Sequence, residues 1–285
     1  MKILVVTPVL LSELGDNIER LYASYKNLRE AFNNDCIFLL VVQCENFNDI
    51  ERQKNKIECK FGAEVIMTNV LNVSKSRNLG IIKSKEYKCS HVIFHDCSIF
   101  YPLNSCLFFS KYAQEDTTPK LKVDFSEKIE YSKHDVLDND FSIKVVNINP
   151  IYDSYVWSYL FKVEKLNIYF DETIGPGNKT HYKSGEYVLF LFSYFLSIRS
   201  SEVKESNYLF VKHPPRPSDY SKHLLYAEGQ GYLFRNLLFR YPSFRVVKGF
   251  LFFFANALFR TLIFRKNSLS ILKLRLRGFF CKSPS

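Results

Sequence analysis

The chain has 285 residues, of which 47% are apolar and 24% charged, and Gly and Pro contribute only 10 each. This composition excludes disordered, collagen-like and low-complexity proteins, and the length suits one large domain or a catalytic domain with an appendage. Seven scattered cysteines without a CxxC pair argue against a zinc knuckle or a disulfide framework and favour a reducing compartment.

Four apolar runs in the first hundred residues alternate with segments of helical periodicity. The runs Ile3–Val6, Cys36–Val42, Ala63–Met67 and His91–His95 predict buried strands, and the segments 18–32, 49–61 and 74–84 predict helices, with Ser74 as a candidate cap. Right-handed crossovers join such units into a parallel sheet that binds ligands at the carboxyl ends of its strands. We therefore predict an α/β fold with a Rossmann-like, mostly parallel sheet flanked by helices. The apolar start is interpreted as the first strand, because no small-residue cleavage site follows it; a signal peptide is the alternative.

The middle of the chain is less regular. Residues 112–150 are polar, with short alternating strands such as Ser142–Val146, and an aromatic segment follows that holds the only tryptophan, Trp157. A strongly apolar helix is predicted over 187–198 and another helix over 218–240.

The excess positive charge lies at the end of the chain. The net charge is +10, and Arg235 to Ser285 holds 11 Lys and Arg residues without any Asp or Glu. In the segment 244–280 the longest charge-free stretch of the main apolar run, Gly249–Phe259, has 11 residues, whereas crossing a bilayer takes about 20.

This segment has the pattern of a basic amphipathic helix. At about 100° per residue, four polar residues share one face and Phe and Leu cover the rest; they are Arg245, Lys248, Asn256 and Arg260. We expect residues 244–285 to bind an anionic membrane surface, at roughly 1 kcal/mol for each cation near the surface. A core helix with a polar outer face is the alternative. Nucleic-acid binding is disfavoured, because the body of the chain carries no basic stripe.

Several residues could carry chemistry. Arg77 could hold a phosphate through its guanidinium, although an arginine in such a position is more often in a surface salt bridge. Asp96 follows a predicted strand and could hold a divalent cation on a diphosphate. Glu186 opens an apolar helix, where an acid either caps the helix or serves as a general base. His213 stands alone in KHPPRP, where a structural role is the simpler interpretation.

The order of these motifs resembles the family 2 glycosyltransferases of bacterial surface-polysaccharide biosynthesis (O-antigen of lipopolysaccharide, or capsule), which have the nucleotide-sugar fold called GT-A. The resemblance spans about residues 1–240. The matching segments are Thr7-Pro8, Ser76-Arg77-Asn78-Leu79-Gly80, Asp96-Cys97-Ser98, Phe170-Asp171-Glu172 with Gly175 and Gly177, Ser184-Gly185-Glu186, and His213-Pro214.

The resemblance implies roles for individual residues. The implied nucleotide-sugar donor site consists of Thr7, Pro8, Gln43, Glu45, Arg77, Asn78, Asp96 and Ser98. The implied acceptor site consists of Trp157, Asp171 and Glu172, with Trp157 stacking on a sugar ring or, equally, serving as a core residue. Asp96 and His213 are the implied ligands of Mg²⁺ or Mn²⁺, and Glu186 is the implied catalytic base, with Asp171 and Glu172 as alternatives.

The chain departs from the family pattern at two positions. Ser98 replaces the second acid of the metal motif, and Tyr187 follows Glu186 where the family often has an Asp. The loss of an anionic ligand weakens the binding of a hard metal ion.

The resemblance implies an inverting glycosyltransferase that moves a sugar, most simply from a UDP-sugar, to a hydroxyl of a lipid-linked or oligosaccharide acceptor. Residues 1–102 would bind the nucleotide sugar, residues 103–217 would bind the acceptor and complete the catalytic site, and residues 218–285 would attach the protein to the membrane. The expected location is cytoplasmic and peripheral, on the inner face of the plasma membrane. The alternative is a catalytically weak or inactive scaffold with the same fold, because both departures fall on the implied site.

Overall fold

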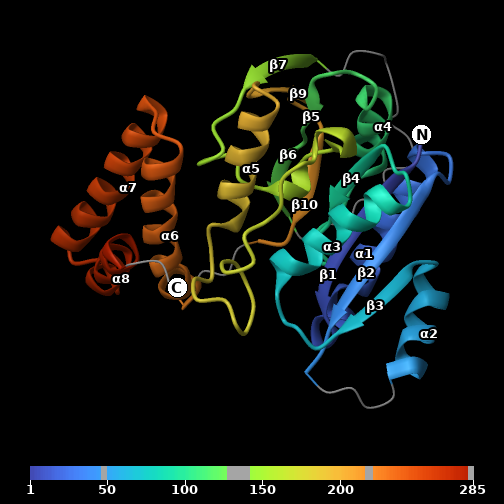
Figure 1. Cartoon of the computed structure of the whole chain (residues 1–285), viewed down its shortest axis with the longest axis horizontal. Helices are drawn as coiled ribbons and strands as arrows, with labels where there is room; N and C mark the ends of the chain where they lie inside the picture. The colour runs from blue at the N-terminus through green and yellow to red at the C-terminus, as the bar shows by residue number, and fades with distance from the viewer. Residues whose placement is uncertain (46–49, 127–141, 216–220, 282–285) are drawn as a thin grey trace.

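The computed structural model describes residues 1–45, 50–126, 142–215 and 221–281. A five-stranded sheet in the order β3-β2-β1-β4-β8 lies at its centre (Figure 1). The strands are β1 (Ile3–Leu10), β2 (Cys36–Gln43), β3 (Glu64–Thr68), β4 (His91–Phe94) and β8 (Phe161–Lys162). The first four run parallel, and β8 pairs antiparallel with β4 at the edge. The predicted mostly parallel sheet is confirmed.

The central strand is buried on both faces. In β1, Ile3 lies opposite Cys36 of β2 and His91 of β4, so both edges of the strand are paired. Ile3 and Val5 contribute to the core on one side of the sheet, and Leu4 and Val6 to the core on the other. A strand that is covered on both faces needs apolar residues at consecutive positions, which explains the continuous run in the sequence.

Helices cover both faces of this sheet. The first face carries α1 (Leu11–Ala31), α2 (Ile50–Phe61) and α4 (Leu103–Tyr112). The second face carries α3 (Val73–Glu86) and α5 (Glu186–Ser197). The predicted helices 49–61, 74–84 and 187–198 lie within two residues of these bounds, whereas α1 begins seven residues before the predicted start at residue 18.

Two small sheets and two short 3-10 helices connect the layers. One sheet joins β5 (Thr118–Pro119), β9 (Glu202–Ser206) and β7 (Ile143–Asn147), and the other joins β6 (Lys122–Phe125) and β10 (Phe210–His213). The 3-10 helices are η1 (Val156–Ser158) and η2 (Val163–Lys165). The expected strand at 142–146 corresponds to β7.

The chain ends in three helices that stand beyond α5, away from the sheet (Figure 1). They are α6 (Ser221–Arg240), α7 (Phe244–Leu262) and α8 (Ser268–Phe280). A Cβ added to Gly231 of α6 or to Gly278 of α8 would lie 1.9 Å from a backbone carbonyl oxygen of the other helix. Glycine is therefore required where these two helices cross, and the crossing holds α8 against α6.

The last segment differs from the single helix predicted from the sequence. The helix is interrupted between Leu262 and Ser268, where Phe264 and Asn267 adopt positive φ angles of 53° and 60°. No helix among the described residues is both long enough and apolar enough to span a membrane. Residues 218–220 of the predicted helix 218–240, residues 216–217 of KHPPRP and residues 282–285 of the predicted membrane segment lie outside the described residues.

Candidate active site

The candidate site begins at the amino end of α3. Asn72, not Ser74 as predicted, caps this helix: its side chain accepts a hydrogen bond from the Lys75 N–H at 2.9 Å. The Asn72 amide also donates to the Glu172 carbonyl at 2.8 Å, and the Ser74 hydroxyl donates to the Ile174 carbonyl at 3.0 Å. These bonds fix the start of α3 against the loop that precedes α5.

Arg77, on the second turn of α3, forms a buried ion pair. Its side chain is 1% exposed, and its Nη2 lies 2.6 Å from Oδ1 of Asp96, which follows β4. The Tyr187 hydroxyl of α5 accepts a hydrogen bond from the same Nη2 and donates to Asp96 Oδ2 at 3.0 Å. The surface salt bridge that is the usual interpretation of such an arginine is therefore wrong. Three separate segments meet at this one carboxylate.

The Arg77 guanidinium remains charged in this environment. Burial alone would lower the pKa of Arg77, but Tyr187, Asp96 and Glu186 raise it, and the net shift is upward. Its Nε and Nη1 atoms are buried and have no hydrogen-bond partner among the residues that the structure describes. The group thus has donors left over after it has bound Asp96.

Glu186, the first residue of α5, is the buried acid of the site. It is 5% exposed and packs against Gly175, where an added Cβ would approach the Glu186 Cδ to 3.0 Å. Gly175 has a φ of 101°, so both its conformation and the space around it require glycine. Burial raises the pKa of Glu186 to about 7, against a lowering by Arg77 and by the backbone N–H groups of Gly185 and Glu186. A carboxylate that titrates near neutral pH is suited to act as a general base.

A cavity of about 440 Å³ opens at the carboxyl ends of β1 and β2, where a parallel sheet binds its ligands. Tyr226 of α6 lines it, and burial, with a smaller contribution from the Glu186 carboxylate, raises the pKa of the tyrosine. Lys183 also lines it, and its ammonium donates to the Gly177 carbonyl at 2.6 Å. Glu186 does not itself line the cavity, but it packs against Gly175, next to Pro176 in the cavity wall, and Lys183 adds a cation to that wall.

Besides Arg77 and Asp96, five of the predicted donor residues divide into two groups. Pro8 and Gln43 line the cavity, and Glu45 accepts a hydrogen bond at 2.9 Å from Asn178, which also lines it. Thr7 is buried and bonds to the Tyr25 hydroxyl at 2.8 Å. Asn78 uses both ends of its amide to hold the backbone of Phe170, at 2.8 and 2.9 Å. Thr7 and Asn78 thus support the site structurally through contacts with the surrounding protein.

The predicted acceptor residues are occupied by other contacts. Trp157 is 2% exposed, with Tyr155 at 4.8 Å and His213 at 5.6 Å between ring centroids. The indole has no free face for a sugar, so the alternative interpretation, a core residue, describes it. Asp171 accepts bonds from the Thr173 N–H and hydroxyl within its own turn, and Glu172 accepts one from Asn78 at 2.9 Å.

The protein alone offers little to a metal ion. Within the described ranges no three or more His, Cys, Asp or Glu side chains form a group that could hold one. His213 packs against Trp157, with its Nδ1 2.6 Å from the Pro214 carbonyl, and both Asp96 oxygens accept bonds from Arg77 or Tyr187. Asp96 keeps further lone pairs, and its side chain is 25% exposed. One carboxylate fits Mg²⁺ or Mn²⁺ only if substrate phosphates supply most of the other ligands.

Sequence reasoning missed three residues of this site, namely Tyr187, Lys183 and Tyr226. Tyr187 follows Glu186 at a position where the family often has an Asp. The sequence shows that this acid is absent, but it does not show that the Tyr187 hydroxyl bonds to Asp96. Lys183 and Tyr226 belong to no motif, and only the fold brings them to the cavity.

No family model and no curated protein matches the sequence. Solved structures do match. The 1–349 fragment of TarS from S. aureus, in complex with UDP-GlcNAc, superposes with a TM-score of 0.56 at 16% identity, covering 98% of this chain and 80% of that one. A longer TarS structure matches 84% of this chain at 17% identity and a TM-score of 0.51. This chain therefore spans only 40% of the length of that TarS structure.

The chain is also similar in structure to a second enzyme. The mannosyltransferase PcManGT from Pyrobaculum calidifontis, in complex with GDP-Man and Mn²⁺, superposes with a TM-score of 0.53 at 8% identity, covering 98% of this chain and 87% of that one. The chain has the GT-A fold. At such identities the likeness shows the fold alone, so the chemistry has to be argued from the residues.

Proposed function

We propose that the protein is an inverting glycosyltransferase that uses a nucleotide-sugar donor, and that it belongs to the family 2 enzymes its motifs resemble. The observation that carries the proposal is Glu186, a buried carboxylate with a pKa of about 7 that lies near the Arg77–Asp96 pair beside the cavity at the strand ends. Two neighbours with this fold were solved with UDP-GlcNAc and with GDP-Man. The TarS likeness favours a UDP-sugar.

In the proposed reaction Glu186 removes the proton from an acceptor hydroxyl. The hydroxyl oxygen attacks the anomeric carbon from the face opposite the diphosphate, the bond from that carbon to the phosphate oxygen breaks, and the nucleoside diphosphate leaves with both electrons. The ammonium of Lys183, which lines the cavity, is the cation proposed to meet the leaving diphosphate. Asp96 would hold Mg²⁺ or Mn²⁺ with most of the other ligands supplied by the donor's phosphates, and the ion would neutralise the same diphosphate charge.

We further propose that the acceptor is a lipid-linked glycan of surface-polysaccharide synthesis and that residues 244–285 hold the enzyme at the cytoplasmic face of the membrane. One face of α7 packs on its neighbours through Val246, Gly249 and Ala257. Several apolar side chains are exposed elsewhere on the same helix; they are Phe244, Val247, Leu251, Leu258 and Leu262.

Cations gather beside this apolar surface. Arg260, Arg265, Lys266 and Arg275 line one small hollow between the last helices. Burial, together with the neighbouring Arg260, lowers the pKa of Arg275 to about 10. Like charges held this close favour an anionic partner, such as a phospholipid headgroup.

The second candidate function is an inactive scaffold. It is favoured by one observation, that both oxygens of Asp96 already accept bonds from Arg77 or Tyr187. Donor turnover separates the two candidates.

The test is release of nucleoside diphosphate from a panel of nucleotide sugars by the full-length protein, with Mg²⁺, with Mn²⁺ and with a chelator. We expect slow release from one donor, lost in Glu186→Gln and retained in Glu19→Gln, an exposed acid on α1 that matches the change in charge. Release that is unaffected by the chelator would support a transferase that does not require a metal ion. Absence of both turnover and donor binding across the panel would favour the scaffold.

A further inference from the structure

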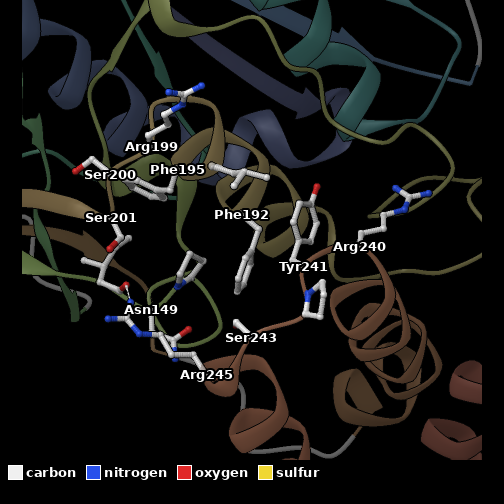
Figure 2. Close-up of a pocket in the computed structure, with 14 residues that line it drawn as sticks. Asn149, Phe192, Phe195, Arg199, Ser200, Ser201, Arg240, Tyr241, Ser243 and Arg245 are labelled. Carbon is white, nitrogen blue, oxygen red and sulfur yellow. Dashed lines mark hydrogen bonds between the residues drawn. The ribbon is translucent and has the colours of Figure 1, made fainter.

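A second cavity lies toward the end of α5 that is opposite Glu186. It has a volume of about 630 Å³ and is enclosed by the end of α5, the turn between α6 and α7, and the segment 148–150 (Figure 2). Glu186 opens α5, whereas Arg199 follows its end. At 1.5 Å per residue, the cavity's lining residues extend from Phe192, about 9 Å along α5 from Glu186, to Arg199, about 20 Å from it, and Glu186 does not line the cavity.

The floor of this cavity is apolar and its rim is cationic. Phe192 and Tyr241 stack within it, with ring centroids 5.7 Å apart. Arg199, Arg240 and Arg245 surround it, each from a different segment (Figure 2). No carboxylate is present among the residues that line it.

Two of these arginines are available for a ligand. Arg245 donates a long bond, 3.5 Å, to the Ile148 carbonyl. Arg199 and Arg240 are exposed, and their guanidinium groups form no ion pair or hydrogen bond with any residue in the described ranges. Each guanidinium at the edge of this cavity can bind a phosphate through paired N–H donors.

The apolar surface of α7 starts at the same opening. Arg245 lies in the first turn of α7, between the exposed Phe244 and Val247, and the exposed Leu251 follows one turn later. A ligand that joins a phosphate to alkyl chains would therefore meet cations at the rim and apolar side chains beyond it. A free phosphate or a sugar phosphate would leave the apolar part unused.

We propose that this cavity binds the phosphate headgroup of an anionic phospholipid, whose chains continue along the exposed apolar side of α7. This inference rests on the membrane attachment proposed above and not on the transferase chemistry. It adds a specific lipid site to a surface that otherwise binds through charge and apolar area alone.

The test uses the full chain and short-chain lipids below their micelle concentration, with binding measured by calorimetry. We expect dihexanoyl phosphatidic acid to bind at one site at least about tenfold more tightly than inorganic phosphate or dihexanoyl phosphatidylcholine. Arg199→Gln combined with Arg240→Gln should weaken the phosphatidic acid by at least about tenfold, since two cations are removed. Lys248→Gln combined with Lys273→Gln, which removes two exposed cations of the tail outside this cavity, should change it less than about twofold.

Each other result overturns the proposal in a defined way. Equal affinity for inorganic phosphate would indicate a phosphate site without a lipid, and equal affinity for phosphatidylcholine would indicate an apolar site without charge recognition. An unchanged affinity in the arginine double variant would place the lipid elsewhere. Donor turnover, measured on the same double variant, should stay at the wild-type level. If the wild-type protein showed no donor turnover, the proposed function would be wrong, but the lipid-binding result would still be valid.

Discussion

The site at the junction of α3 and α5 and the surface of the three last helices depart from ordinary burial in opposite directions. At the junction, charged side chains are inside: Arg77 is 1% exposed and Glu186 5%. On α7 and just after it, large apolar side chains are outside, up to Phe264 at 93%. Unpaired buried charges and exposed apolar groups both reduce stability, so their presence points to a function at each place.

The difference assigns separate roles to the two regions. Buried polar groups hold a fixed geometry and shifted pKa values, which chemistry requires. An exposed apolar face beside cations has no such geometry, and it suits a fluid, anionic surface. Changes in the first region should therefore alter turnover and stability, and changes in the second should alter membrane binding alone.

Replacing the buried acid should have the largest effect. Glu186→Gln preserves the shape of the side chain but removes the base, so turnover should fall by roughly 10² to 10⁴. Donor affinity should stay within about twofold of wild type, because the change leaves the cavity walls intact. Steady-state release of nucleoside diphosphate and equilibrium donor binding measure the two quantities. Turnover above a tenth of wild type would move the base to another acid.

Removing the buried cation should destabilise the whole fold. Arg77→Met leaves Asp96 and Glu186 without their counter-charge, and such a change costs about 3–5 kcal/mol of unfolding free energy. Urea unfolding measures this loss, with Arg77→Lys as the control that retains the charge and should lose less. Equal losses in both variants would mean that packing of the guanidinium, and not its charge, holds the site together.

The pH dependence of stability should carry the signature of Glu186. Its pKa is about 7 in the folded protein against 4.5 for a free side chain, so between these values the folded state binds more protons than the unfolded state. The contribution of Glu186 to the unfolding free energy therefore falls as pH rises from about 4.5 to about 7, by roughly 3 kcal/mol. Compared with wild type, Glu186→Gln should gain stability at pH 8 relative to pH 5. A pH-independent difference would show that the pKa is not raised.

Changing the exposed face of α7 should have the smallest effect on the fold. Leu251 and Leu258 are more than half exposed, so replacing both with serine should change the unfolding free energy by less than about 0.5 kcal/mol. Binding to vesicles of phosphatidylglycerol, measured by sedimentation, should fall at least about tenfold. A loss of stability comparable to that of Arg77→Met would identify this face as part of the core.

The sequence predicts the sheet well and the site in part. A strand covered on both faces must be apolar at every position, so β1, β2 and β4 are visible in the printed residues. The order of short motifs also points to Arg77, Asp96 and Glu186. Arg77 and Asp96 are 19 residues apart, but both bond to Tyr187, which is 110 residues from the first and 91 from the second, and no local pattern contains that information.

The errors have the same origin. Asn72 caps α3 because its amide also reaches the loop at residue 172, whereas Ser74 faces Ile174. Trp157 is covered by His213, a neighbour that only the fold supplies. The last segment divides into two helices, and α8 packs against α6 through glycines that helical periodicity does not distinguish.

One experiment tests the separation of the two regions directly. Donor turnover and vesicle binding are measured together on the wild type, on Glu186→Gln and on the α7 variant with serine at positions 251 and 258. We predict that Glu186→Gln loses turnover and binds vesicles like the wild type, while the α7 variant loses vesicle binding and retains turnover from a water-soluble donor. Loss of both properties in either variant, or turnover that survives Glu186→Gln, would contradict the assignment of chemistry to the buried site and attachment to the last helices.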